Sequence, residues 1–131
     1  AGSGILSIAA AKLGASKVTG VETDSVAIRS ARANLRANGV TRTVRLYHGS
    51  LPQERISPGE ADLALANISA KTLIELAPLL RIALRKGGRL VASGLLTERK
   101  GDVRAAFGSA KLTVDEEHVD GDWVALVSTA D

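Results

Sequence analysis

Short apolar runs alternate with longer helix-like segments along most of this chain, and the alternation limits the fold more than any other feature. Strands that alternate with helices form a mainly parallel sheet with helices on both faces. We therefore predict an α/β fold with strands at 17–22, 43–47, 61–66 and 89–92, and helices at 5–13, 25–38, 69–86 and 97–107. Two last strands, 112–119 and 123–128, flank Asp120-Gly121-Asp122, which indicates an antiparallel hairpin.

Three details refine this prediction. The run ADLALA at 61–66 is apolar throughout, as in a strand that is covered on both faces. Pro78 lies inside the helix at 69–86 and should kink it or divide it in two. Trp123 could pack in the core or border the ligand site, and core packing is the interpretation that we favour.

Composition excludes several classes of protein. The length of 131 residues suggests one domain, and 45% apolar with 24% charged residues is typical of a globular chain. The absence of cysteine excludes disulfides and thiolate metal sites. No apolar run approaches the ~20 residues that cross a bilayer, and no secretory signal is recognisable, so a cytoplasmic protein without a membrane anchor is expected.

The basic excess is small, at a net charge of +3, and aromatic residues make up only 2%. Arg29, Arg32 and Arg36 could share one helix face, which we interpret as a solvated surface. Single-strand binding surfaces depend on aromatic stacking. Direct nucleic-acid binding is therefore not expected.

Gly2-Ser3-Gly4 opens the first expected helix. Glycines let the backbone approach a ligand closely, and the unpaired N–H groups of a helix start can bind a phosphate or a carboxylate. The same residues also suit a simple turn or a helix cap. The motif alone leaves both interpretations open.

Glu22 ends the first expected strand, 18 residues after Gly4. In nucleoside-binding α/β folds an acidic residue at roughly this spacing accepts hydrogen bonds from the ribose hydroxyls. Asp24 either contacts the same ligand or caps the following helix, and capping is the interpretation that we favour. Glu22 makes the glycines a candidate nucleoside site.

Asn67 directly follows the apolar strand at 61–66, at the carboxyl end where ligands bind in this architecture. Its carboxamide oxygen can accept a hydrogen bond from a substrate N–H and orient the nitrogen lone pair. Asn also serves as a turn residue or helix cap, so both roles remain open. His48 is interpreted as a surface or hydrogen-bonded residue, and Ser93-Gly94 lacks the pattern of a nucleophile turn.

Taken in order, these segments resemble the bacterial methyltransferase family that modifies large-subunit ribosomal protein L11. The matching segments are GSGILSIAAAKLGA, VTGVETDSVAIRSARANLRANGV, ADLALANISAKTLIELAPLL, GGRLVASGLL and GDWVALVS. They cover nearly the whole chain, and ANI and SGLL, each after a strand, distinguish this family from generic methyltransferases. The resemblance implies a Rossmann-like methyltransferase fold with S-adenosyl-L-methionine as the cofactor.

The resemblance also implies roles for residues in the loops after the strands. The expected cofactor contacts are Gly2, Ser3, Gly4, Glu22, Asp24, Ser50, Leu51 and Asn67. Glu22 stands where the family usually has Asp, and Ser50-Leu51 falls in the loop that flanks adenine. Asn67 falls on the family's asparagine near the methyl donor and the incoming amine, which implies a catalytic role.

The family's preceding strand, the first glycine of its motif and its substrate-recognition domain would lie before Ala1. Residues 1–131 are therefore expected to be an incomplete catalytic domain. Because that strand lies in the middle of the family's sheet, its absence would expose two strand edges. We expect self-association, low stability or weak cofactor binding of this segment alone.

The implied activity is N-methylation of α-amino and lysine groups of ribosomal protein L11. One alternative is a related methyltransferase that acts on another protein, RNA or a small molecule. The other is a catalytically silent nucleotide-binding fragment.

Overall fold

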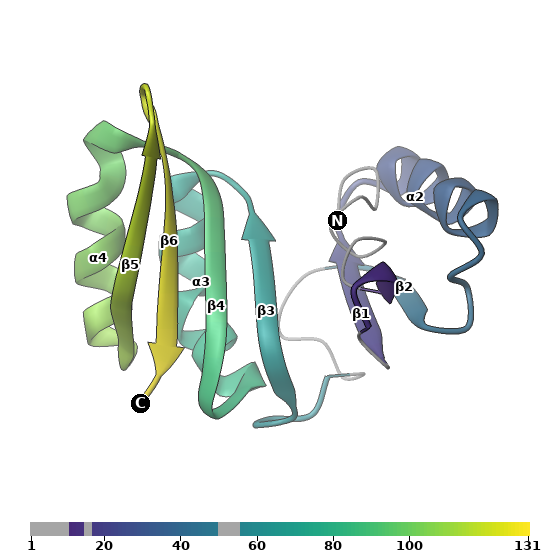
Figure 1. The fold of residues 1–131 in the computed structure, drawn as a ribbon, viewed down its shortest axis with the longest axis horizontal. Coiled ribbons are helices and arrows are strands. Elements are labelled where there is room, and N and C mark those ends of the chain that lie inside the picture. The colour runs from purple at the N-terminus through teal and green to yellow at the C-terminus, as the bar shows by residue number, and fades with distance from the viewer. Residues whose placement is uncertain (1–10, 15–16, 50–55) are drawn as a thin grey trace. The chain divides into compact units, whose positions relative to one another are not determined.

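A computed structural model describes residues 11–14, 17–49 and 56–131, which fall into two compact units, 1–53 and 54–131 (Figure 1). Each unit is treated by itself. The described elements of the first unit are β1 (Val18–Glu22), α2 (Ser25–Ala37) and β2 (Val44–His48). Those of the second are β3 (Ala61–Asn67), α3 (Ala70–Ala83), β4 (Leu84–Leu96), the 3-10 helix η1 (Thr97–Arg99), α4 (Lys100–Ser109), β5 (Leu112–Asp120) and β6 (Trp123–Ala130).

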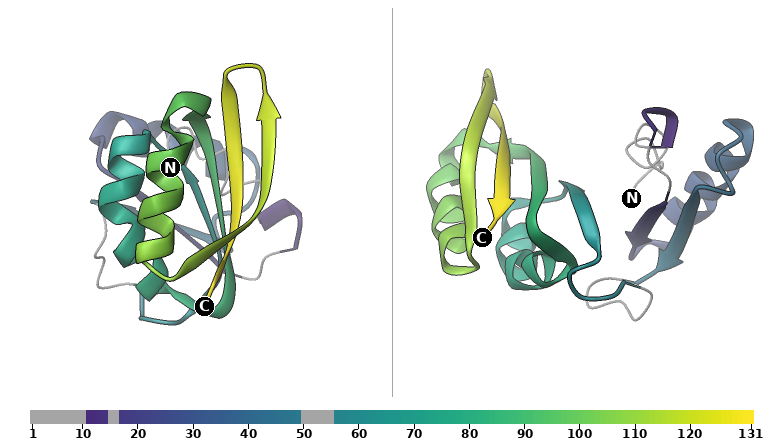
Figure 2. Two further views of the ribbon diagram at one scale, coloured as in Figure 1. Left: turned by 90° about the vertical axis from the view of Figure 1, so that its left-hand side faces the viewer. Right: turned by 60° about the horizontal axis from the view of Figure 1, so that its bottom comes forward.

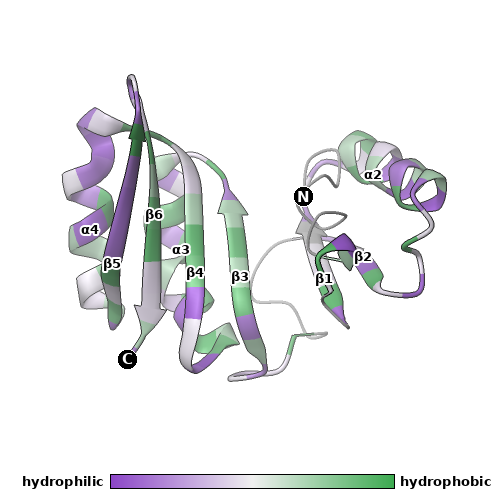
Figure 3. Ribbon diagram, viewed as in Figure 1, coloured by the Kyte–Doolittle hydropathy of each residue, from purple (hydrophilic) through white to green (hydrophobic). Residues whose placement is uncertain are grey.

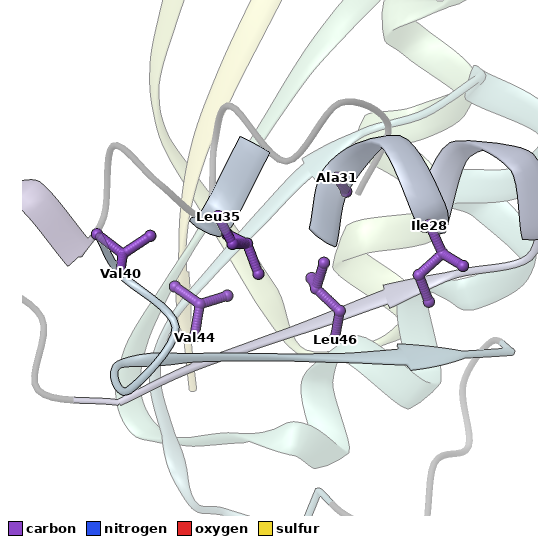
Figure 4. Packing of buried hydrophobic residues seen from close by; sticks show 6 residues of the cluster. All are labelled: Ile28, Ala31, Leu35, Val40, Val44 and Leu46. Atoms are coloured by element: carbon purple, nitrogen blue, oxygen red, sulfur yellow. The ribbon is translucent and has the colours of Figure 1, made fainter. Parts of the chain in front are cut away.

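The first unit joins two parallel strands to one helix. β1 pairs with β2 in register from Val18 opposite Val44 to Glu22 opposite His48. Helix α2 buries one face against this pair, because apolar residues recur at helical spacing. The resulting core cluster is shown in Figure 4 and consists of Ile28, Ala31, Leu35, Val40, Val44 and Leu46.

The second unit is a four-stranded sheet in the order β3-β4-β6-β5. β3 and β4 are parallel, whereas β6 runs antiparallel to both β4 and β5. Helices α3 and α4 lie on the same face of this sheet (Figure 2). On that face Leu90, Leu126, Val103 and Phe107 are fully buried.

The two outer strands of this sheet differ in polarity. Hydrophobic colour runs along much of β3 in Figure 3, and hydrophilic colour along much of β5. In β3 the side chains of Leu63 and Leu65 are 50% and 38% exposed. Within the second unit, α3 and α4 cover one face of the sheet, so the elements of this unit alone do not meet the expectation that residues 61–66 are covered on both faces.

The element order and the C-terminal hairpin confirm the predicted α/β fold. Helix α3 runs without interruption through Pro78 and ends at Ala83, so Pro78 does not divide the helix, and the expected end at residue 86 is wrong. A kink at Pro78 stays a prediction. Trp123 is 54% exposed rather than buried. The buried residues of β6 are the even-numbered ones from Val124 onward. Because side chains alternate between the two faces of a strand, Trp123 lies on the face opposite to these residues.

Most of the expected helix at 5–13 lies outside the described residues. Its end is described: Gly14 has a φ of +108°, and its N–H donates to the carbonyl of Ala11 at 3.2 Å. A glycine with positive φ ends a helix as the sequence predicts. Among the described helices, none has the length and apolar character that a bilayer crossing requires.

Candidate functional site

Two acidic residues lie together in the turn that follows β1. The Glu22 carboxylate accepts a hydrogen bond from the backbone N–H of Asp24 at 3.1 Å. The Asp24 carboxylate in turn accepts one from the backbone N–H of Val26 at 2.9 Å. Val26 is the second residue of α2, so Asp24 is the N-cap of this helix. The capping interpretation of Asp24 is confirmed.

Residues at the end of β2 form hydrogen bonds with the same turn. The His48 Nε2 lies 2.8 Å from the carbonyl oxygen of Thr23, and the Gly49 N–H donates to the carbonyl of Glu22 at 2.8 Å. Because a carbonyl oxygen only accepts, Nε2 must carry the proton. The interpretation of His48 as a hydrogen-bonded residue is confirmed. Its place opposite Glu22 follows from the parallel register, which the sequence alone did not specify.

Asn67 is the last residue of β3, where it pairs with Ser93 of the parallel strand β4, so it lies at the carboxyl end of β3. Its side chain is exposed and makes no hydrogen bond to any residue that the structure describes. The cap of α3 is Ser69, whose Oγ accepts from the backbone N–H of Thr72 at 3.3 Å. The interpretation of Asn67 as the helix cap is therefore wrong, and its carboxamide is available for another partner.

Gly94 of β4 lies next to the Asn67 side chain. Its φ is +76°, a conformation that residues with a Cβ rarely adopt. A Cβ added at Gly94 would overlap the Asn67 Oδ1 and lie 3.3 Å from its Cγ. No role of Gly94 was predicted from the sequence. A glycine inside an apolar strand pattern is the signal that indicates such a close approach.

The candidate residues thus fall into three sets. Glu22 and Asp24 are brought together in the first unit, and Asn67 lies in the second unit. The remaining candidates lie outside the described residues, and they are Gly2, Ser3, Gly4, Ser50 and Leu51.

Comparison with known proteins places these residues in a family. The family model for "ribosomal protein L11 methyltransferase (PrmA)" matches residues 1–131. A ribosomal protein L11 methyltransferase of Pelobacter propionicus is 45% identical across 96% of this chain and 40% of the relative. One of Chloroflexus aurantiacus is 39% identical across 96% of this chain and 45% of the relative. The chain thus spans less than half the length of these relatives.

Solved structures agree in fold. The ribosomal protein L11 methylase of Lactobacillus delbrueckii subsp. bulgaricus matches with a TM-score of 0.90 and 31% identity, over 99% of this chain and 67% of that one. An RNA methyltransferase of Salinibacter ruber matches with a TM-score of 0.75 and 21% identity, over 99% of this chain and 76% of that one. The second likeness concerns the Rossmann-like methyltransferase fold alone. With a family model that matches along its whole length, this chain belongs to the ribosomal protein L11 methyltransferase family.

Proposed function

We propose that this chain is the catalytic part of an S-adenosyl-L-methionine-dependent N-methyltransferase that acts on amine groups of ribosomal protein L11. One observation carries the proposal: the Asn67 carboxamide stands at the carboxyl end of a parallel strand, and Ser69 rather than Asn67 caps the next helix. Membership of the family supports the reaction and the substrate. A ribosomal substrate also favours a cytoplasmic location.

The hydrogen-bonding groups of the chain suit this cofactor. A carboxylate at the end of β1, as in Glu22, can accept hydrogen bonds from two neighbouring hydroxyls of a ribose. Gly2, Ser3 and Gly4 would offer backbone N–H groups to the carboxylate of the cofactor. We assign Ser50 and Leu51 to the adenine and keep Asp24 as a further contact candidate beside its capping role.

The bound cofactor supplies a methyl group on a positively charged sulfur, which is reactive toward a neutral amine. The task of the protein is then to align the amine and to exclude water. We assign the alignment to Asn67, whose Oδ1 would accept a hydrogen bond from the amine N–H and direct the lone pair. A carboxamide is not basic at neutral pH, so the proton released after transfer leaves to water.

The protonation state of the substrate limits which amines react. An α-amino group has an ordinary pKa of about 8, and a lysine side chain one of about 10.4. At neutral pH the α-amino group is therefore neutral far more often. Methylation of an α-amino group should be faster than that of lysine, and lysine methylation should accelerate more strongly as the pH rises to 9.

Asn67→Ala in the complete protein tests the proposal. Turnover of ribosomal protein L11 should fall by about 10- to 100-fold, since only alignment is lost, while the affinity for S-adenosylhomocysteine should stay within about twofold. Ser69→Ala is the matched control, because it removes the cap of α3 and lowers stability without removing the carboxamide. An unchanged turnover of Asn67→Ala would refute the alignment role. Cofactor binding without methylation of L11 would favour the related methyltransferase with another substrate.

We further propose that residues 1–131 form part of a larger catalytic domain. The edges of the second sheet support this idea. β5 is an outer strand with acidic residues along it, which is how natural edge strands avoid pairing. β3 is the other outer strand, and it exposes Leu63 and Leu65 instead. A strand of this composition is suited to a further neighbour.

The isolated chain should accordingly self-associate through β3. Light scattering coupled to size-exclusion chromatography would measure this, with Leu65→Lys as the variant that places a charge on the strand. A lower mass for Leu65→Lys than for the unchanged chain supports the proposal. A monomeric unchanged chain contradicts it.

A further inference from the structure

Gly94 occupies a β-bulge in the middle of the second sheet. Between Ala92 and Leu95 the β4 chain takes three residue steps, while its partner β6 takes two, from Leu126 to Val124. The extra residue keeps Ala92 and Leu95 on the same buried face, at 0% and 1% exposure. Gly94, with its φ of +76°, is part of this extra step.

The same residue lies against the Asn67 carboxamide. A Cβ at position 94 would overlap the Asn67 Oδ1, and its next nearest atom, the Asn67 Cγ, would lie at 3.3 Å. Apart from the residues next to Gly94 in the chain, no other atom of the described residues lies within 4 Å of such a Cβ. The Asn67 carboxamide therefore lies where a side chain at position 94 would begin, and its oxygen is the atom to which we assign the alignment of the amine.

We propose that Gly94 is a positioning residue for Asn67, because the missing side chain lets the carboxamide oxygen stand at the carboxyl end of β3. The inference rests on the proposed function of Asn67. A methyl group at position 94 forces the carboxamide to rotate away, since it is the mobile end of a flexible side chain with no hydrogen bond to a described residue. The backbone of β3 can stay where it is.

Two effects of Gly94→Ala must be separated: strain from the positive φ, and displacement of Asn67. Gly59 provides the matched control, because its φ is +71° and a Cβ there would meet no atom of the described residues within 4 Å. Gly59→Ala thus carries the strain alone. The two variants should lower the unfolding midpoint by comparable amounts, because the Asn67 side chain can rotate at little cost.

The displacement itself can be observed without any assay of activity. In the complete protein labelled with ¹⁵N, the side-chain amide resonances of Asn67 can be assigned by their absence in Asn67→Ala. Gly94→Ala should shift these resonances, and Gly59→Ala should leave them in place. Unchanged Asn67 resonances in a folded Gly94→Ala protein would overturn the inference.

A double-mutant cycle measures the consequence for catalysis. Gly94→Ala should lower turnover by about 10- to 100-fold when Asn67 is present, because small misplacements of an aligning group have effects of this size. In the Asn67→Ala background the same change should cost less than about twofold, and Gly59→Ala should have no effect on turnover in either background. The KM for the cofactor should stay within about twofold throughout.

The outcomes separate the two proposals. Equal losses from Gly94→Ala in both backgrounds would overturn the positioning role, whatever Asn67 does. If Asn67→Ala itself leaves turnover unchanged, the proposed function of Asn67 fails, and the amide resonances still decide whether Gly94 positions this side chain. If Gly94→Ala does not fold, restored folding in Gly94→Ala/Asn67→Ala supports the overlap, and failure of both variants overturns it.

Discussion

Asp24 allows the capping of a helix to be separated from contact with the cofactor. Its carboxylate accepts the Val26 N–H at 2.9 Å, and the first turn of α2 contains no other acidic residue. Asp24 therefore supplies both the capping oxygen and the negative charge beside the positive end of the helix dipole. Asp24→Ala removes both contributions, whereas Asp24→Ser keeps a capping oxygen and removes only the charge.

The expected magnitudes follow from these two contributions. Loss of an N-cap oxygen costs about 0.5–2 kcal/mol, and loss of a charge near an exposed helix start costs about 0.3–1 kcal/mol. Asp24→Ala should thus lower the free energy of unfolding by about 1–2 kcal/mol, and Asp24→Ser by about 0.5 kcal/mol. For a chain of this size the difference corresponds to about 3–5 °C in the unfolding midpoint, measured by circular dichroism.

Binding of S-adenosylhomocysteine to the complete protein, measured by calorimetric titration, decides the second role. If Asp24 only caps α2, Asp24→Ser should bind like the unchanged protein. If Asp24 also contacts the cofactor, Asp24→Ser should bind about tenfold more weakly although its stability is nearly kept. Equal destabilisation by Asp24→Ala and Asp24→Ser would refute the reasoning, because the capping oxygen would then contribute nothing.

Two further predictions concern the second unit. Ser128 is fully buried, and its Oγ has no hydrogen-bond partner among the described residues. Urea denaturation should show Ser128→Ala unchanged or stabilised by about 1 kcal/mol, and Thr129→Val, which loses a hydrogen-bonded hydroxyl, destabilised by about 1 kcal/mol. Hydrogen bonding from Lys100, together with the charges of Lys100 and Arg104, lowers the pKa of Glu117. The ionised Glu117 carboxylate should therefore stabilise the folded chain fully at neutral pH, and this contribution should be lost as the pH falls below about 4.5. In Glu117→Gln the unfolding midpoint should fall less steeply over this acid range than in the unchanged chain.

Local chemistry made part of this fold predictable. Both termini of helix α2 were predictable. The Asp24 carboxylate caps its start, and Gly39 adopts a φ of +68° just after its last residue. The hairpin follows from Gly121, whose φ of +59° suits a two-residue turn between Asp120 and Trp123. In each case a few neighbouring residues determine the conformation.

Features that depend on distant residues were not predictable from these patterns. The exposure of Leu63 and Leu65 depends on which sheet face α3 and α4 cover, and an apolar run is the same whether one face or two are covered. The role of Gly94 depends on Asn67, which is far away in the sequence and meets it only through the pairing of β3 with β4.

The bulge in β4 also means that the number of residues in this strand, and not only their identity, determines which side chains are buried. Deleting Gly94 would leave Ala92 and Leu95 two steps apart, as in a regular strand, so Leu95 would keep its buried place opposite Val124. Deleting Val91, in the regular part of the strand before the bulge, would instead reverse the alternation of the residues that follow. Leu95, which is 1% exposed, would then exchange places with Leu96, which is 39% exposed. The bulge is thus the place where β4 can lose a residue without turning its core side chains outward.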